Sequence, residues 1–570
     1  MMPAPDRRPG GPPPEARPAG ELDWIPPPLR AACARRARLL LPLLAVASGI
    51  LLAGAFPPRE SWISAWAALI PLLVVCRFSS PMAAFRLGYL SGVSFWLPSL
   101  FWFAGLAHQG IPAAVAILGW IGLAAYCALY TAAFATIAAA GFARGGAADW
   151  RRNVAFLAVM PLAWAGLEYA RTYAFTGFPW NPLGVSQYTN LAVIQVAEWG
   201  GVYGVSALVL LVNAGLMLTL FNFRGVSVAG AYRAHPELLL TLGAVAAAMV
   251  SGAHRVQAFR AARQPTLRIA IVQPAIPQDA KWDAAYVTMI YARLDALTRQ
   301  ACATQPAMVI WPETANPAPT IDDAECKPIL EGLLTNGTPL LVGSTDFRAA
   351  PGNASPLVFN SSILCLPGGQ AVQVYDKQHL TPFGEYAPVR WLIPFFERVA
   401  PVGWTSLTAG RTSTIFRLPD RPDAPFAALI CFEDAFPDLA RRAVRAGARF
   451  LVDQSNDAWF DHTSGPRQHL AHCVFRCVEN RVPAVRATNT GISAFISSYG
   501  AIRTELNPME TGMLADTIRV SPPTLPPTFF AAHGRNILVP CATVAVLAFV
   551  LVIWRERRLK SQPTGSGGTV

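Results

Sequence analysis

The 570-residue chain combines 53% hydrophobic residues with only 14% charged residues and a mean hydropathy of +0.35, a composition typical of membrane proteins and unlike that of soluble ones. Its net charge of +12 comes from arginines that cluster beside apolar runs. That pattern encodes orientation in a membrane, so it does not indicate nucleic-acid binding. Cysteines and histidines lack the spacing of a metal site, and we expect no metal and no other cofactor.

Apolar segments of membrane-spanning length dominate the first half of the chain. Residues 1–37, rich in Pro, Gly and Arg, are predicted to form a disordered cytoplasmic tail. We expect a membrane domain of seven helices within 38–254, one further transmembrane helix at 536–554 and a second cytoplasmic tail at 555–570. The seven predicted spans are 38–56, 62–77, 86–106, 113–141, 154–172, 203–223 and 237–254.

The distribution of arginine predicts the orientation of these helices. Arginines crowd the N-terminal tail and every second loop after it, whereas the short intervening loops carry only Arg59 and Arg171. Because cytoplasmic loops are enriched in positive charge, we expect both termini in the cytoplasm. The region 255–530 then lies on the outer side of the membrane.

The outer region alternates short apolar runs with polar or helical stretches, which is typical of a layered α/β domain. Three of its runs end in residues suited to acyl transfer: "MVIWPE" ends at Glu313, "QVYDK" at Lys377, and "ALICFED" contains Cys431. Functional groups in α/β sheets gather just beyond strand ends, so these three side chains are predicted to converge.

This combination of side chains can activate a thiol. A free thiol is only slightly ionised at neutral pH and needs help to act as a nucleophile. A carboxylate can take its proton, and an ammonium group can stabilise the thiolate and the oxyanion that follows. The backbone N–H of Phe432, directly after Cys431, is predicted to be a further oxyanion donor.

Longer motifs surround these residues: "IAIVQPAIPQDAKW", "VIWPETANP", "YDKQHLTPFGEYAP", "ICFEDAFP" and "SNDAWF". Together they resemble the carbon-nitrogen hydrolase (nitrilase) superfamily. With the membrane helices and the segment "WAGLEYARTYAFTGFPWNPLGVSQY", the chain is similar to its membrane-bound apolipoprotein N-acyltransferase family.

The resemblance implies a fold and a set of site residues. The fold is an αββα sandwich attached to about eight transmembrane helices. Glu313 corresponds to the general base, Lys377 to the electrostatic stabiliser and Cys431 to the nucleophile. The supporting positions implied by the same motifs are two carboxylates, Glu385 and Glu433, and a substrate-binding aromatic, Trp282.

The resemblance also implies a reaction and its partners. A fatty acyl chain would pass from a phospholipid, through a Cys431 thioester, to the α-amino group of the N-terminal diacylglyceryl-cysteine of an apolipoprotein. The enzyme would lie in the bacterial inner membrane with its catalytic domain in the periplasm. Alternatives are a membrane-tethered amidase or nitrilase, and a transporter or sensor with an outer ligand-binding domain; Glu168 is among few ionisable residues in the spans.

Aromatic residues near the predicted site suggest a lipid-facing gate, because aromatic side chains favour the headgroup region. Its members are Phe178, Trp180, Tyr386, Trp391, Phe395 and Phe396; ordinary packing is an equally good interpretation. His462, His469 and His472 follow on a predicted helix and its lead-in, at spacings that do not indicate a metal site.

Overall fold

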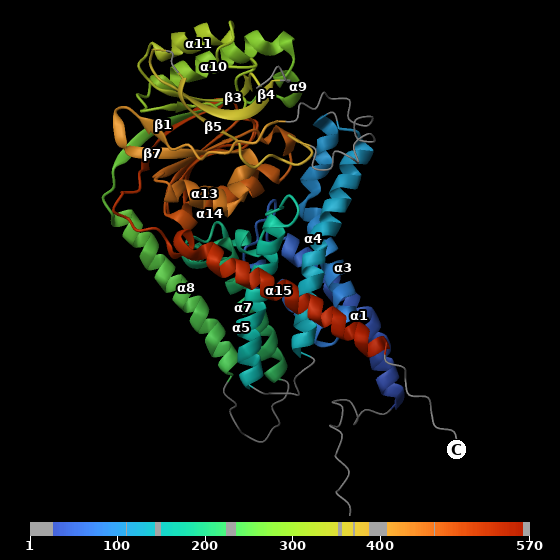
Figure 1. The fold of residues 1–570 in the computed structure, drawn as a ribbon. Helices are drawn as coiled ribbons and strands as arrows, with labels where there is room; N and C mark the ends of the chain where they lie inside the picture. The colour runs from blue at the N-terminus through green and yellow to red at the C-terminus, as the bar shows by residue number, and fades with distance from the viewer. Residues whose placement is uncertain are drawn as a thin grey trace, which may run out of the picture.

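The computed structural model describes residues 27–109, 111–142, 150–223, 235–350, 356–368, 371–386, 407–460 and 462–561. A group of long apolar helices forms one end of the molecule, and two stacked sheets flanked by helices form the other (Figure 1). The described part of the membrane domain contains α1 (Pro27–Ala53), α2 (Ile70–Arg77), α3 (Pro81–Ser99), α4 (Ala113–Phe142), α5 (Trp150–Tyr173), α6 (Leu191–Ile194), α7 (Ala197–Phe223), α8 (Pro236–Ala261) and α15 (Phe529–Ser561).

Helices occur at every predicted span, but they differ in length. Five are long and apolar enough to cross a membrane, namely those in α4, α5, α7, α8 and α15. A sixth span is formed if α3 is counted with the 3-10 helix η2 (Phe101–Gln109), to which it is joined by a 42° bend. The predicted spans 38–56 and 62–77 coincide with shorter apolar helices, so the count of eight stays a prediction.

The first and the last helix extend beyond the bounds predicted for them. Helix α1 begins at Pro27, eleven residues before the predicted span at residue 38, and proline suits the first turn of a helix. Helix α15 begins at Phe529 and continues to Ser561, beyond both ends of the predicted span 536–554. Residues 1–26 and 562–570, the remaining parts of the two predicted tails, lie outside the described residues.

The outer domain contains two six-stranded sheets. The first has the order β12-β1-β2-β3-β4-β5 and the second the order β11-β10-β9-β8-β7-β6. The central strands β1, β2 and β3 are parallel, as are β7, β8 and β9. The strands are β1 (Thr266–Gln273), β2 (Val309–Ile310), β3 (Leu340–Arg348), β4 (Leu357–Cys365), β5 (Ala371–Asp376), β6 (Phe416–Leu418), β7 (Arg421–Ile430), β8 (Phe450–Ser455), β9 (Ala484–Thr488), β10 (Ser493–Ile496), β11 (Ile502–Leu506) and β12 (Gly512–Arg519).

Helices cover the outer faces of both sheets. The first sheet packs against α10 (Val287–Cys302) and α11 (Cys326–Leu334), and the second against α13 (Pro437–Arg445) and α14 (Gly465–Asn480). The short helix α9 (Gln278–Lys281) follows β1. Apolar side chains such as Ile269, Phe426 and Val485 fill the space between the sheets. The predicted αββα sandwich is therefore observed in the described residues (Figure 1).

The second sheet and the membrane helices share one hydrophobic core. Leu429 on β7 and Val474 on α14 belong to the same buried cluster as Leu210 on α7. Ion pairs also cross the boundary, with Arg481 donating to Glu198 at 2.8 Å. The layer of α13 and α14 thus lies between the two sheets and the membrane domain (Figure 1).

Candidate active site

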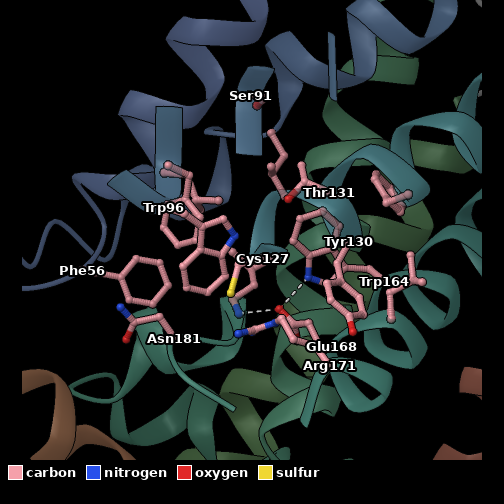
Figure 2. Close-up of a pocket in the computed structure, with 16 residues that line it drawn as sticks. Phe56, Ser91, Trp96, Cys127, Tyr130, Thr131, Trp164, Glu168, Arg171 and Asn181 are labelled. Carbon is pink, nitrogen blue, oxygen red and sulfur yellow. Dashed lines mark hydrogen bonds between the residues drawn. The ribbon is translucent and has the colours of Figure 1, made fainter. Parts of the chain in front are cut away.

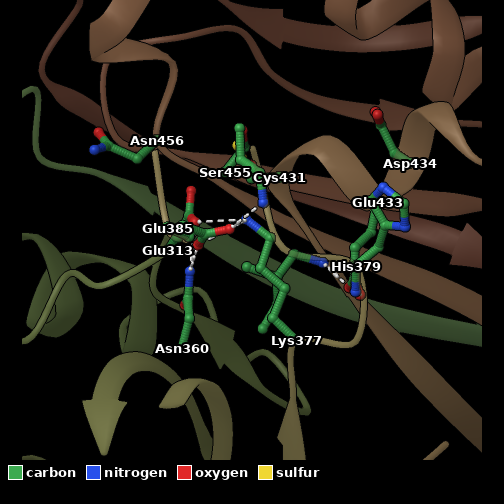
Figure 3. A network of polar contacts seen from close by, with 12 residues as sticks. Glu313, Asn360, Lys377, His379, Glu385, Cys431, Glu433, Asp434, Ser455 and Asn456 are labelled. Carbon is green, nitrogen blue, oxygen red and sulfur yellow. Dashed lines mark hydrogen bonds and ion pairs between the residues drawn. The ribbon is translucent and has the colours of Figure 1, made fainter. Parts of the chain in front are cut away.

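The three predicted site residues lie at the ends of strands. Glu313 follows β2, Lys377 follows β5, and Cys431 opens the 3-10 helix η7 (Cys431–Ala435) directly after β7. In Figure 3 their side chains point toward one another, with the Lys377 ammonium beside Cys431. Cys431 has φ of 55°, a left-handed backbone conformation that is uncommon for a residue other than glycine. The turn after the strand therefore presents the thiol sharply toward the neighbouring sheet.

Glu313, Lys377 and Glu385 form a buried charge network. Lys377 Nζ lies 3.5 Å from Glu313 Oε1 and 2.9 Å from Glu385 Oε2. Asn360 on β4 bridges the two carboxylates, because its Nδ2 donates to Glu313 Oε1 at 2.7 Å and to Glu385 Oε1 at 2.9 Å. Glu313 and Lys377 are buried and the Glu385 side chain is only 14% exposed, so each charge depends on the others.

The electrostatics of the site determine which groups are charged at rest. Burial alone lowers the pKa of Lys377, but Glu385, Glu313 and Cys431 outweigh it and raise that pKa above its ordinary value. Burial and the neighbouring Glu313 raise the pKa of the Cys431 thiol, while Lys377 opposes them. Cys431 is therefore a thiol at rest, and a base would have to take its proton for it to attack a substrate.

Glu433 binds both the turn that begins at Cys431 and the segment after Lys377. Its Oε2 accepts a hydrogen bond from the Ile430 N–H at 2.9 Å, and its Oε1 accepts from the Gln378 N–H at 2.7 Å and the His379 N–H at 3.0 Å. The Tyr375 hydroxyl contacts both oxygens. This carboxylate is fully buried and connects the turn at Cys431 to the segment after Lys377.

A second buried lysine adjoins the site. Lys281 Nζ donates to the Glu313 backbone carbonyl at 3.0 Å and lies 5.7 Å from the centre of the Trp282 ring. Burial lowers the pKa of Lys281 to about 8, although Glu313 and Cys431 act to raise it. Trp282 itself is 55% exposed, so its ring is free to contact a substrate from outside.

Two ionisable residues of α5 support the loop between α5 and α6. The Glu168 carboxylate accepts hydrogen bonds from the Leu183 N–H and the Trp164 indole, both at 2.7 Å. Arg171 Nη1 donates to the carbonyls of Phe178 and Trp180, both at 2.8 Å. Both α5 residues line a cavity in the membrane domain (Figure 2). Glu168 and Arg171 thereby fix the backbone of this loop at three points.

The same loop reaches the residue next to the nucleophile. The rings of Phe178 and Trp180 lie 6.5 Å and 6.3 Å from the Phe432 ring, and the Trp180 indole donates to Gln468 Oε1 at 2.7 Å. Trp180 is buried, so the prediction that it forms part of a lipid-facing gate is wrong. Its polar tip is satisfied by Gln468, which is distant in the sequence. Of the other proposed gate residues, Phe178 and Tyr386 are described and partly exposed; Trp391, Phe395 and Phe396 lie outside the described residues.

Sequence reasoning missed Asn360 and Lys281. Asn360 lies in β4, whose sequence is "LVFNSSILC". Its three consecutive polar residues interrupt the apolar pattern from which a buried strand is predicted. Lys281 precedes Trp282, and its burial is not visible in the sequence because the surrounding segment is polar.

Known protein families match both halves of the chain. The family model for the apolipoprotein N-acyltransferase N-terminal domain matches residues 48–215, and that for carbon-nitrogen hydrolase matches residues 268–521. An apolipoprotein N-acyltransferase of Geobacter metallireducens is 36% identical over 89% of this chain and 95% of its own length. The chain belongs to this family.

A second apolipoprotein N-acyltransferase agrees with this assignment. The apolipoprotein N-acyltransferase of Rhodopseudomonas palustris is 29% identical over 90% of this chain and 95% of its own length. A solved amidase from Nesterenkonia sp. is 19% identical, with a TM-score of 0.34, and covers 49% of this chain and 96% of the amidase. The apolipoprotein N-acyltransferase relatives thus extend over both the membrane helices and the sandwich domain.

Three residues in the described part of the chain are close enough together to suggest a metal site. Asp434, Asp453 and Cys473 place potential ligand atoms within 4.8 Å of one another. The Arg486 guanidinium already forms ion pairs with both carboxylates. A positive charge therefore occupies the position that a cation would need, and these residues do not suit a metal ion.

Proposed function

We propose that this protein transfers a fatty acyl chain from a phospholipid to the α-amino group of the N-terminal diacylglyceryl-cysteine of an apolipoprotein, with Cys431 as nucleophile. The observation that carries the assignment of residues is the buried pairing of Lys377 with Glu313 and Glu385 beside the Cys431 thiol. These are the groups that acyl transfer through a thioester requires.

In the first half-reaction, Glu313 takes the thiol proton as sulfur attacks the ester carbonyl of the phospholipid. The carbonyl oxygen becomes negative, and Lys377 Nζ with the Phe432 N–H stabilises that charge. The C–O bond then breaks, and the proton held by Glu313 passes to the departing lyso-phospholipid alkoxide. The acyl chain remains on Cys431 as a thioester, and Glu313 is again a carboxylate.

In the second half-reaction, the free amine of the acceptor attacks the thioester carbonyl. A C–N bond forms, the C–S bond breaks, and Glu313 moves one amine proton to the sulfur. The products are an amide and the regenerated thiol. Because the order is ping-pong, one set of side chains serves both steps.

The position of the domain suits substrates that remain in a bilayer. We propose that the sandwich domain lies on the periplasmic side of the inner membrane, with both termini in the cytoplasm. The shared core of the second sheet and the membrane helices supports this placement, because it holds the Cys431 turn close to the membrane domain. Neither acylated substrate then needs to leave the membrane.

The test uses the purified full-length protein in phospholipid vesicles. Mass spectrometry of the peptide containing Cys431 should show a mass increase equal to one acyl chain, and Cys431→Ala should show none. Adding a diacylated lipopeptide with a free N-terminus should discharge the adduct and produce the N-acyl lipopeptide. If turnover proceeded without the adduct, the thioester mechanism would be wrong; if free fatty acid were the main product, the protein would be a hydrolase.

A further inference from the structure

A buried histidine contacts the backbone of the nucleophile from the side of the second sheet that faces the membrane domain. His469 on α14 is 1% exposed, and its Nε2 lies 3.3 Å from the Cys431 carbonyl oxygen. The same Nε2 lies 3.0 Å from Asp434 Oδ1, and Nδ1 lies 2.8 Å from Asp457 Oδ1. Three acceptor oxygens therefore surround one imidazole ring.

These contacts place a proton on Nε2, and the two carboxylates favour the charged form of the ring. A carbonyl oxygen only accepts hydrogen bonds, so Nε2 must carry a proton, and the Asp457 carboxylate favours a second proton on Nδ1. Burial and Arg486, whose Nη2 lies 2.9 Å from Nδ1, act against this charge. Asp434 and Asp457 outweigh them and raise the pKa of His469 to about 10.

The contacted carbonyl belongs to the peptide that also carries the predicted oxyanion donor. A trans peptide is planar, and its C=O and N–H point in opposite directions. The Cys431 carbonyl points toward His469, so the Phe432 N–H points away from it. Because Cys431 has φ of 55°, its backbone needs such external support to stay in the left-handed region.

We propose that His469 is a positioning residue for acyl transfer, which donates from Nε2 to the Cys431 carbonyl and so fixes the direction of the Phe432 N–H. The inference rests on the proposed role of Cys431 as nucleophile. His469 does not contact the reacting atoms; it acts through the peptide between Cys431 and Phe432. Its effect is therefore confined to steps in which an oxyanion forms.

The chain offers a matched control on the same helix. His472, one turn further along α14, is also 1% exposed, and its ring lies 5.1 Å from the Trp180 ring, compared with 5.6 Å for His469. Its Nε2 is buried with no hydrogen-bond partner among the described residues, and burial lowers the pKa of His472 to about 3. Substituting it perturbs the same layer without touching Cys431.

The experiment compares His469→Asn, His469→Gln and His472→Asn in the full-length protein. A Gln amide can still reach the Cys431 carbonyl, whereas an Asn amide reaches only as far as the position of Nδ1. Two rates are measured for each variant: acyl-adduct formation from phospholipid, and alkylation of Cys431 by iodoacetamide, which forms no oxyanion. The wild-type protein must first form the adduct; if it does not, the proposed function itself fails.

We expect His469→Asn to slow adduct formation by about tenfold or more, an amount in keeping with loss of one charge-assisted hydrogen bond. The KM for phospholipid and the rate of alkylation at high pH should stay near wild type, and His469→Gln should lie between. His472→Asn should acylate within about twofold of wild type. Equal acylation by the two Asn variants would overturn the proposal, as would a parallel loss of alkylation. If His469→Asn does not fold, His469→Gln is compared with His472→Asn in its place, and equal acylation by these two variants would overturn the proposal.

Discussion

Replacing Glu433 with glutamine should detach the turn of the nucleophile from the segment after Lys377. The wild-type carboxylate accepts from three backbone N–H groups and from Tyr375. A glutamine oxygen can keep the two donors from residues 378 and 379, but its NH₂ then faces the Ile430 N–H. One charge-assisted hydrogen bond is lost and the others weaken, while burying a neutral amide costs less than burying a charge. The net loss in unfolding free energy should be about 2–4 kcal/mol.

The assay combines thermal unfolding in detergent with the rate of acyl-adduct formation on Cys431. The rate should fall more than the stability alone explains, because the freed end of the turn carries the thiol. Tyr375→Phe is the control: it removes one hydroxyl donor but leaves all three N–H groups, and it should cost about 1 kcal/mol with nearly normal acylation. If Glu433→Gln acylated as fast as Tyr375→Phe, Glu433 would not hold the turn in position.

Three further predictions concern the same site. Asn360→Leu leaves Glu313 and Glu385 without their shared donor, so acylation should fall by about tenfold or more while the protein still folds, as checked by adduct formation and thermal unfolding. Lys281→Met removes a cation whose pKa is about 8, so the pH profile of Cys431 alkylation should lose any step near that pH. An unchanged profile would show that the charge of Lys281 does not influence the Cys431 thiol. The pKa of His469 is raised to about 10, so its stabilising effect is complete below its unfolded pKa of about 6.5 and is lost as pH rises through 10. Thermal unfolding between pH 6 and pH 10 should accordingly show a smaller decline for His469→Gln than for wild type.

The strand ends of the candidate site were predictable mainly because buried parallel strands have nearly continuous apolar sequences. Glu313 and Cys431 follow the parallel strands β2 and β7, whereas Lys377 follows the antiparallel edge strand β5, and the structure places the three together. Strand β4 was not predicted, because the polar side chains that make Asn360 useful also interrupt the apolar pattern. Sequence patterns report local burial, so they find a catalytic strand end more easily than the polar residue that supports it.

Long-range contacts account for the remaining differences. Tryptophan is a residue type expected at a lipid interface, but the Trp180 indole donates a hydrogen bond to Gln468, which lies 288 residues later in the chain. Glu168 is an ionisable residue within a span, which favours a transport function when read alone. Its bond to the Leu183 N–H instead holds a loop. Such partners are fixed by tertiary structure and leave no trace in local periodicity.

The contacts of Gln468 make the sandwich domain dependent on the membrane domain. Its side chain receives the Trp180 indole and donates to the backbone carbonyls of Pro57 and Ser99, so a single amide from the sandwich domain joins three separate segments of the membrane domain. Cutting the chain between the two domains would expose that amide together with the apolar face of α14. The sandwich domain, expressed alone, should therefore aggregate or unfold, and the lipid-embedded helices are part of its folding environment.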